Sequence, residues 1–141
     1  MIQRIQSIFL FLSSASFWSL FALPIASSDS VDSHIYADLI LNLKDHPGLM
    51  GLCVAGGLVS LVAIFLFNNR KLQKGLAYLA IGCSLGLAGL GYWLFSSGGS
   101  SEGTSLGAGI AMPVLSFILT ILALVFISKD DKLVKSMDRL R

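Results

Sequence analysis

The sequence predicts an all-α integral membrane protein, with four transmembrane helices in an antiparallel bundle and both termini in the cytoplasm. The first observation is composition: 55% of the 141 residues are hydrophobic and 13% are charged, with a mean hydropathy of +0.80. An ordinary soluble domain carries about 25% charged residues. A chain this apolar is expected to lie in a lipid bilayer.

The second observation is four apolar runs that contain no Asp, Glu, Lys, Arg or His, namely residues 7–26, 48–67, 76–95 and 106–127. A helix needs roughly 20 such residues to cross a hydrocarbon core of about 30 Å. Together the runs predict one membrane domain, 1–141. Its remaining parts are two outer loops, an inner loop and a tail, at residues 27–47, 96–105, 68–75 and 128–141.

The third observation is the placement of charge. Nine of the ten basic residues precede the first run, separate the second and third, or follow the fourth, and only Lys44 falls in an outer loop. Basic residues in short loops are retained on the cytoplasmic side of a membrane. This asymmetry places both termini in the cytoplasm.

The first run has an alternative interpretation. Arg4, the apolar core that follows it and the ending "PIASS" faintly resemble a cleavable signal peptide. The length of the apolar run and Pro24, three residues before the cleavage point, favour a retained helix. Cleavage would leave the other three helices in the same orientation.

The longer outer loop predicts a short amphipathic helix, because Ile35, Leu39 and Leu43 recur every four residues. Its histidines, His34 and His46, lie among aspartates, so a metal site is an alternative to a solvated polar loop. No compact ligand spacing is present, and the solvated loop is preferred. Pro47 and Gly48 mark the expected start of the second helix.

Small residues in the runs predict close helix packing. Gly82, Gly86 and Gly89 share one face of the third run, and glycine lets helix backbones approach closely in lipid. Packing inside the monomer is favoured, with dimerisation through Gly82 and Gly86 as the alternative. The second run supplies a matching surface at Gly56, Gly57 and Ser60.

The fourth run contains Pro113, which has no N–H. A proline inside a helix frees the carbonyl four residues earlier, here that of Gly109. The sequence therefore predicts a kink in the outer half of this helix.

Several activities lack the residues they need. The runs hold no titratable group for a coupled transporter, and Cys53 and Cys83 lie at different depths, which disfavours a disulfide. Hydrolase motifs are absent, and the basic tail is too short and mixed in sign for nucleic acid. We therefore expect a noncatalytic protein with no cofactor and no catalytic or metal-binding residue. The alternative is a small permease or channel that uses neutral groups, namely Ser60, Ser84, Ser116 and Thr120.

The tail is the one segment rich in charge, and it predicts an amphipathic helix. Leu133, Met137 and Leu140 form an i, i+4, i+7 stripe, with Lys132 and Lys135 elsewhere around the helix. We expect the two chain ends to form a cytoplasmic contact surface. Its candidate residues are Arg4, Lys132, Leu133, Lys135, Met137, Asp138, Arg139, Leu140 and Arg141.

The start "MIQRIQ" and the ending "KLVKSMDRLR" resemble an uncharacterised bacterial four-span membrane protein family, domain of unknown function family 4293, of Bacteroidetes type. Lys135 and Met137 depart from its closing pattern but preserve charge and apolarity. The resemblance implies a multi-pass protein of the bacterial inner membrane and no particular activity. The expected role is accessory, scaffolding or partner-binding, with the bilayer, a membrane or cytoplasmic protein and a second copy as candidate partners.

Overall fold

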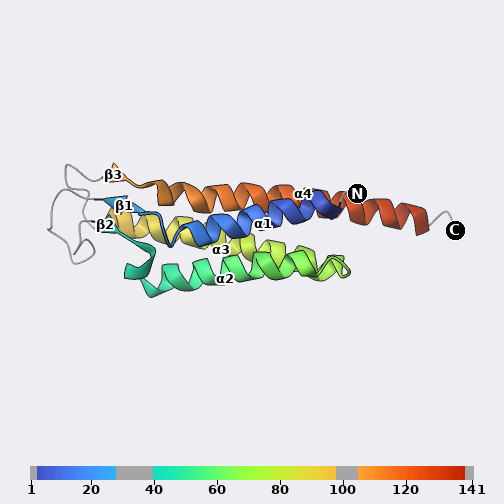
Figure 1. Cartoon of the computed structure of the whole chain (residues 1–141), viewed down its shortest axis with the longest axis horizontal. Helices are drawn as coiled ribbons and strands as arrows, with labels where there is room; N and C mark the ends of the chain where they lie inside the picture. Colours follow the sequence, from blue (N-terminus) through green and yellow to red (C-terminus); the bar gives the residue numbers. More distant parts are fainter. Residues whose placement is uncertain (1–2, 28–39, 98–104, 139–141) are drawn as a thin grey trace.

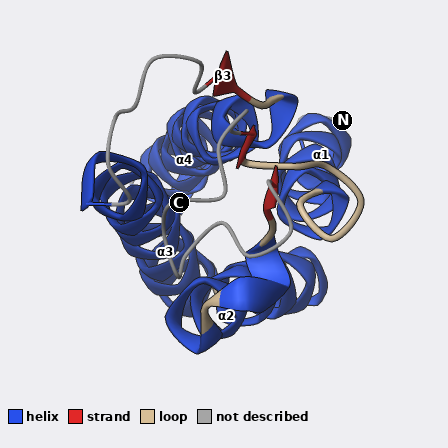
Figure 2. Cartoon of the chain, turned by 90° about the vertical axis from the view of Figure 1, so that its left-hand side faces the viewer, coloured by secondary structure: helices blue, strands red, loops and turns tan. Residues whose placement is uncertain are grey.

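The computed structural model describes residues 3–27, 40–97 and 105–138. Its helices of more than three residues are α1 (Gln3–Ser19), α2 (Pro47–Phe65), α3 (Arg70–Ser97) and α4 (Ala111–Asp138). Seen end-on, these four helices form a ring in chain order, in which α4 closes against α1 (Figure 2). Successive helices run in opposite directions, so α1 begins and α4 ends at the same end (Figure 1). We call this the hairpin end, because the α2–α3 turn lies there, and the opposite one the sheet end.

The α2–α3 turn is tighter than the predicted loop of residues 68–75. Helix α3 already begins at Arg70, because Asn69 caps it: the Leu72 N–H donates to Asn69 Oδ1 over 3.3 Å. Arg70, Lys71 and Lys74 lie before the third apolar run, but Arg and Lys are good helix formers, so the helix includes them. The predicted start of the second helix is confirmed, since α2 begins at Pro47 and His46 Nδ1 accepts from the Gly48 N–H.

Helix α1 ends earlier than the apolar run of residues 7–26. Its α-helical hydrogen bonding stops at Ser19, where Leu20 and Phe21 donate to the carbonyls of Phe17 and Trp18 in tighter, three-residue turns. Pro24 follows and disfavours a helical conformation in the residue before it. The apolar run therefore extends beyond the end of α1, and its last residues form non-helical turns.

The structure is mostly helical, as predicted, and a small antiparallel sheet of two-residue strands closes the sheet end. Its strands are β1 (Ala26–Ser27), β2 (Ile40–Leu41) and β3 (Ser105–Leu106), in the order β2-β1-β3. The predicted amphipathic helix is wrong where it can be compared, because Ile40–Leu41 is extended. Leu43 lies in a 3-10 turn, η1 (Leu43–Asp45), while Ile35 and Leu39 lie outside the described residues.

Pro113 does not kink α4 in its interior. A 3-10 turn, η2 (Ala108–Ile110), precedes α4, so Pro113 is the third residue of the helix. The first N–H groups of a helix have no intrahelical acceptor, which makes the missing N–H harmless. The Gly109 N–H instead donates to the Pro24 carbonyl over 2.9 Å and joins α4 to the turn after α1.

Close packing between α1 and α2 relies on glycine. A Cβ added at Gly56 would lie 2.5 Å from the Phe17 ring, and one at Gly57 would lie 3.0 Å from the Trp18 indole. The small surface on α2 is therefore used, but its partner is α1 and not the glycine face of α3. Cys53 lies one turn away, buried, and its thiol donates to the Phe17 carbonyl over 2.9 Å.

The predicted packing face of α3 is mostly turned outward. A Cβ at Gly86 would meet Leu52 of α2 at 3.2 Å, but one at Gly82 or Gly89 would meet nothing within 4 Å. The buried face is a different one, and it carries Gln73, Ala77, Ala80, Cys83, Ser84, Leu87, Gly91 and Leu94. Packing inside the monomer is thus seen at Gly86 alone of the three predicted glycines.

Neutral polar side chains in the ring bond to the chain itself. Ser13 and Thr120 share a hydrogen bond of 2.8 Å between α1 and α4, and Thr120 also donates to the Ser116 carbonyl over 2.7 Å. Ser14 donates to the Gly57 carbonyl and so links α1 to α2. Cys83, like Cys53, is a free buried thiol. Most of these polar groups act as helix-packing contacts.

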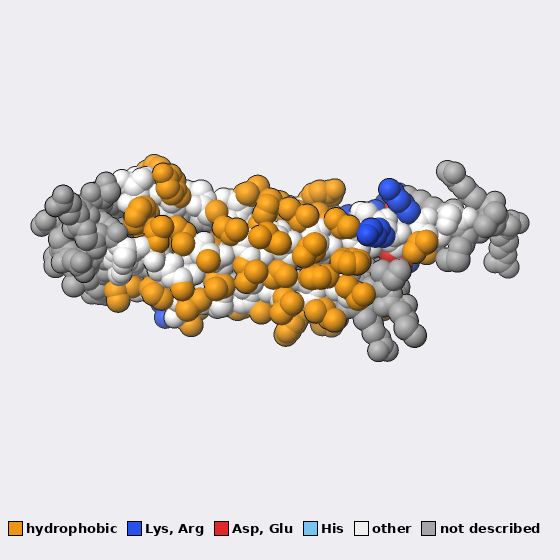
Figure 3. All heavy atoms as spheres, turned by 90° about the horizontal axis from the view of Figure 1, so that it is seen from above, with side chains coloured by type: hydrophobic (Ala, Val, Ile, Leu, Met, Phe, Trp, Pro, Cys, Tyr) orange, Lys and Arg blue, Asp and Glu red, His pale blue; other side chains and the backbone are white. Residues whose placement is uncertain are grey.

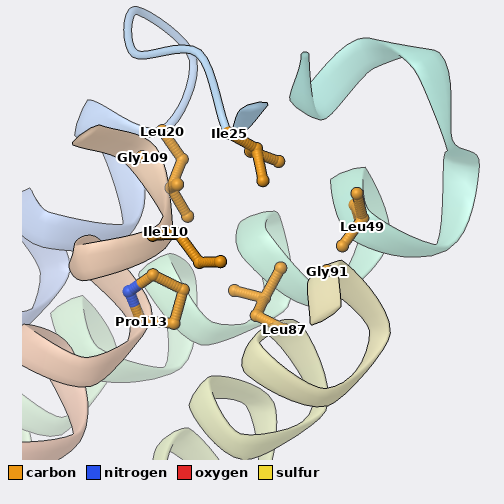
Figure 4. Close-up of a pocket in the computed structure, with 8 residues that line it drawn as sticks. All are labelled: Leu20, Ile25, Leu49, Leu87, Gly91, Gly109, Ile110 and Pro113. Carbon is orange, nitrogen blue, oxygen red and sulfur yellow. The ribbon is translucent and has the colours of Figure 1, made fainter. Parts of the chain in front are cut away.

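A small apolar cavity lies beneath the sheet, with a volume of about 10 Å³. Its lining comes from α2, α3, α4, η2 and the segment that follows α1, namely Leu20, Ile25, Leu49, Leu87, Gly91, Gly109, Ile110 and Pro113 (Figure 4). One water needs about 10–15 Å³ and two or more polar partners. This cavity is therefore a packing defect.

The outer surface of the helices is apolar. Phe11, Phe65, Leu85 and Ile118 are exposed, one from each helix. On the face shown in Figure 3, hydrophobic side chains extend along the whole ring, while Lys and Arg side chains gather near the hairpin end. Three helical segments are long and apolar enough to cross a membrane: Pro47–Phe65, Arg70–Ser97 and Ala108–Val134. The apolar part of α1, Ile5–Ser19, is shorter.

Replacing Gly56 by Ala should destabilise the protein, because the new Cβ overlaps the buried Phe17 ring. Overpacking of this kind costs about 1–3 kcal/mol. The matched control is Gly51→Ala in the same helix, where a Cβ meets nothing within 4 Å. Thermal unfolding in detergent should show a lower Tm for Gly56→Ala and an unchanged or higher one for Gly51→Ala. Equal Tm values would contradict the described α1–α2 packing.

Candidate interaction surface at the hairpin end

The end of α4 extends beyond the α2–α3 turn. Helix α4 continues to Asp138, and Figure 1 shows its last turns projecting past the other helices. We call residues 129–138 the arm. Charged residues end the apolar run before the arm, but nothing in this segment breaks a helix, so α4 continues through it.

Two ion pairs join the base of the arm to α3. Arg70 Nη2 lies 3.1 Å from Asp130 Oδ2, and Lys74 Nζ lies 2.8 Å from Asp131 Oδ2. The side chains are 15% to 26% exposed, so these pairs are partly shielded from water. Arg70 and Lys74 are four residues apart and share a face of α3, where they meet two consecutive aspartates. The pairs therefore set the direction in which the arm leaves the ring.

The structure places part of the predicted contact surface. Lys132 and Leu133 lie on the arm, and both side chains are exposed, Leu133 by 48%. The backbones of Arg4, Lys135, Met137 and Asp138 lie in α1 or α4, while their side chains are not described. Arg139, Leu140 and Arg141 lie outside the described residues.

An open groove separates the arm from the α2–α3 turn. It has a volume of about 500 Å³ and is lined by Phe67, Asn68, Asn69, Arg70, Lys71 and Val134. We call it the turn groove. Among the described residues, its lining contains two cations and two amides, but no carboxylate. Hydrogen-bond donors and positive charge therefore dominate its chemistry.

Two buried glutamines lie near the starts of α1 and α3. Gln73 is fully buried on α3 and donates from Nε2 to the Ala63 carbonyl over 3.0 Å, while its Oε1 has no partner among the described residues. Gln6 of α1 is 2% exposed, and its Oε1 likewise lacks a described partner. Sequence reasoning missed both residues. The signal for Gln73 was its spacing of four and seven residues from Ala77 and Ala80, on the face that is buried.

The described residues contain no group of three or more His, Cys, Asp or Glu side chains arranged to hold a metal ion. His46 caps α2 through its Nδ1 atom. Asp45 accepts from the Asn42 N–H over 2.6 Å and closes the 3-10 turn before it. His34 lies outside the described residues. Both described side chains therefore serve the start of α2.

Comparison with known proteins identifies the family. The family described as Domain of unknown function (DUF4293) matches residues 2–140. The chain belongs to this family. No curated protein matches the chain. The match includes all but the first and last residue of the two terminal segments that carried the resemblance, and the family's description assigns no role.

Replacing Asp130 and Asp131 together by Asn should loosen the arm, because both ion pairs to α3 are lost. Such pairs contribute about 0.2–1 kcal/mol each when exposed, so we expect local opening to increase about fivefold. Hydrogen exchange of the arm amides measures this change. Lys132→Gln alters one exposed charge on the same helix and is the control. Unchanged arm protection in the double variant would show that the pairs do not hold the arm.

Proposed function

We propose that the protein is a noncatalytic accessory or scaffolding component of the bacterial inner membrane, which presents the arm to a protein partner in the cytoplasm. All four helices cross the bilayer in this proposal, as a transmembrane bundle with both termini in the cytoplasm. The observation that carries it is the unbroken helix α4, which is apolar along the ring and charged beyond it.

The apolar surface supports the membrane-crossing part of the proposal. Exposed large hydrophobic side chains lie on every helix, and three segments meet the length and apolarity needed for crossing. Helix α1 has 17 residues, or about 26 Å, which is short for a core of about 30 Å. The apolar turn from Leu20 to Leu23 supplies the missing length, and its backbone is partly bonded within the turn. Such non-helical backbone is tolerated at membrane depth where the protein satisfies it.

The length of α4 supports the role of the arm. Its 28 residues measure about 42 Å, which exceeds the core of about 30 Å by some eight residues. The last eight residues, 131–138, carry Lys132 together with exposed Leu133. An exposed leucine on a directed helix that carries charges of both signs is suited to packing against another protein, because apolar contact supplies affinity and charge supplies orientation.

The neutral polar groups favour packing over a solute pathway. Ser84, Ser116 and Thr120 donate to carbonyls of their own helices. Ser60 is fully buried, and its hydroxyl has no partner among the described residues. The protons of the Ser84, Ser116 and Thr120 hydroxyls are thus already donated within the protein, which favours a packing role for these three residues.

Reporter fusions test the orientation. A fluorescent protein that matures only in the cytoplasm, fused after Arg141, should fluoresce. Alkaline phosphatase, which folds only outside the cytoplasm, should be active when inserted within residues 98–104. The reciprocal pair of fusions is the control and should be silent. Phosphatase activity at Arg141 would overturn the proposed topology.

Truncation tests the partner role. Deleting residues 132–141 should remove specific proteins from crosslinked pull-downs in intact cells, while membrane insertion persists. In the full chain, Leu133→Gln should weaken capture by about tenfold, since burying a leucine contributes about 1.5–3 kcal/mol. Lys132→Gln introduces glutamine at the neighbouring position and should weaken capture less. Identical captured proteins with and without residues 132–141 would refute the role of the arm.

A further inference from the structure

The turn groove combines a ligand-sized volume with a lining of one chemical character. Ligand sites commonly have volumes of about 300–1,000 Å³, and the groove measures about 500 Å³. Its polar lining offers amide and cationic donors from Asn68, Asn69, Arg70 and Lys71, with no carboxylate among them. Phe67 and Val134 add apolar walls. An anion with an apolar neighbour fits this lining better than a neutral polar molecule does.

The donors of the groove are only partly used inside the protein. The Arg70 guanidinium contacts Asp130 twice: Nη2 pairs with the carboxylate, and Nη1 donates to the backbone carbonyl. A guanidinium has five N–H donors, so others remain. Lys71 is exposed and makes no ion pair within the described part of the chain. Asn69 uses its Oδ1 to cap α3, which leaves its amide N–H groups for a ligand.

The surroundings of the groove are apolar. Phe65 is 76% exposed just before the turn, and Leu72 is 55% exposed just after it. The turn is where α2 ends and α3 begins, so it marks the limit of the apolar surface on these two helices. A polar, cationic groove between exposed apolar side chains matches a molecule with an anionic head and an apolar tail.

We propose that the turn groove binds the headgroup of an anionic phospholipid. Arg70 and Lys71 contact the phosphate, because charge-assisted hydrogen bonds from cations to phosphate are among the stronger ones. The Asn68 and Asn69 amides bond to headgroup hydroxyls, and the acyl chains lie over Phe65 and Leu72. This site rests on the proposed membrane crossing, which places the turn at the cytoplasmic headgroup level.

The site also connects lipid to the arm. Arg70 reaches both the groove and Asp130, and Val134 of the arm forms one wall. A headgroup in the groove therefore contacts the residues that set the direction of the arm.

A titration of the full chain in uncharged detergent tests the site. The probes are dihexanoyl phosphatidylglycerol, dihexanoyl phosphatidylcholine and inorganic phosphate, at about 0.15 M salt, where exposed charges are screened beyond about 8 Å. Native mass spectrometry counts the bound molecules at each concentration. The variants are Lys71→Gln in the groove, Lys71→Arg as the conservative replacement and Lys132→Gln as the matched change on the arm.

We expect phosphatidylglycerol to bind in preference to phosphatidylcholine. Lys71→Gln should weaken binding by about tenfold, as expected for a lost hydrogen bond to a charged group, and Lys71→Arg should retain it. Lys132→Gln should change it by less than about twofold. Equal losses in Lys71→Gln and Lys132→Gln would show general charge attraction and overturn the site. Equal binding of the two lipids would overturn headgroup recognition, and displacement by equimolar inorganic phosphate would assign the groove to free phosphate.

The reporter fusions are repeated in Lys71→Gln, where the topology should be unchanged. If the wild-type chain has the proposed topology but binds no lipid, the lipid site is overturned and the proposed function stands. A wrong topology would remove the membrane setting on which it rests.

Discussion

Most of the described polar side chains buried in this ring of apolar helices are paired by the chain itself, and the rest of the structure depends on this pairing. Water is excluded from the helix interfaces, so an unpaired group there is costly. Ser14 therefore bonds to the Gly57 carbonyl, Thr120 to Ser13, and Gln73 to the Ala63 carbonyl. These bonds join α1 to α2 and to α4, and α3 to α2. They fix neighbouring helices to one another more specifically than apolar contact does.

The same constraint explains the sheet end. Helix α1 stops at Ser19, which leaves backbone groups of the following turn without helical partners. The Gly107 and Gly109 N–H groups donate to the carbonyls of Ile25 and Pro24, each over 2.9 Å. Both glycines are needed, since a Cβ at either position would lie less than 3.0 Å from the Pro24 carbonyl oxygen. The chain before α4 thus completes the hydrogen bonding that α1 leaves open.

At the hairpin end, charge replaces these neutral bonds. Arg70 and Lys74 compensate Asp130 and Asp131 where α4 leaves the ring, so the arm begins in a defined direction. The arrangement leaves Lys71, Lys132 and Leu133 exposed at the same end. A lipid in the turn groove and a protein on the arm would therefore meet the same short stretch of α4.

The sequence by itself determined the helical class, the order of the helices and the start of α2. Uninterrupted apolar runs and Pro47 are local signals, and they need no knowledge of neighbours. Only the tertiary structure decided where α1 ends, which face of α3 is buried and what Asp130 and Asp131 pair with. The sequence predicted a kink at Pro113, because it does not show where α4 begins. That start depends on the contacts of the preceding segment with the sheet end. The sequence predicted that Gly82 and Gly89 pack inside the monomer, because glycine spacing shows which residues share a helix face. Which face has a partner is decided by the positions of Leu52 and Phe17, which only the tertiary structure gives.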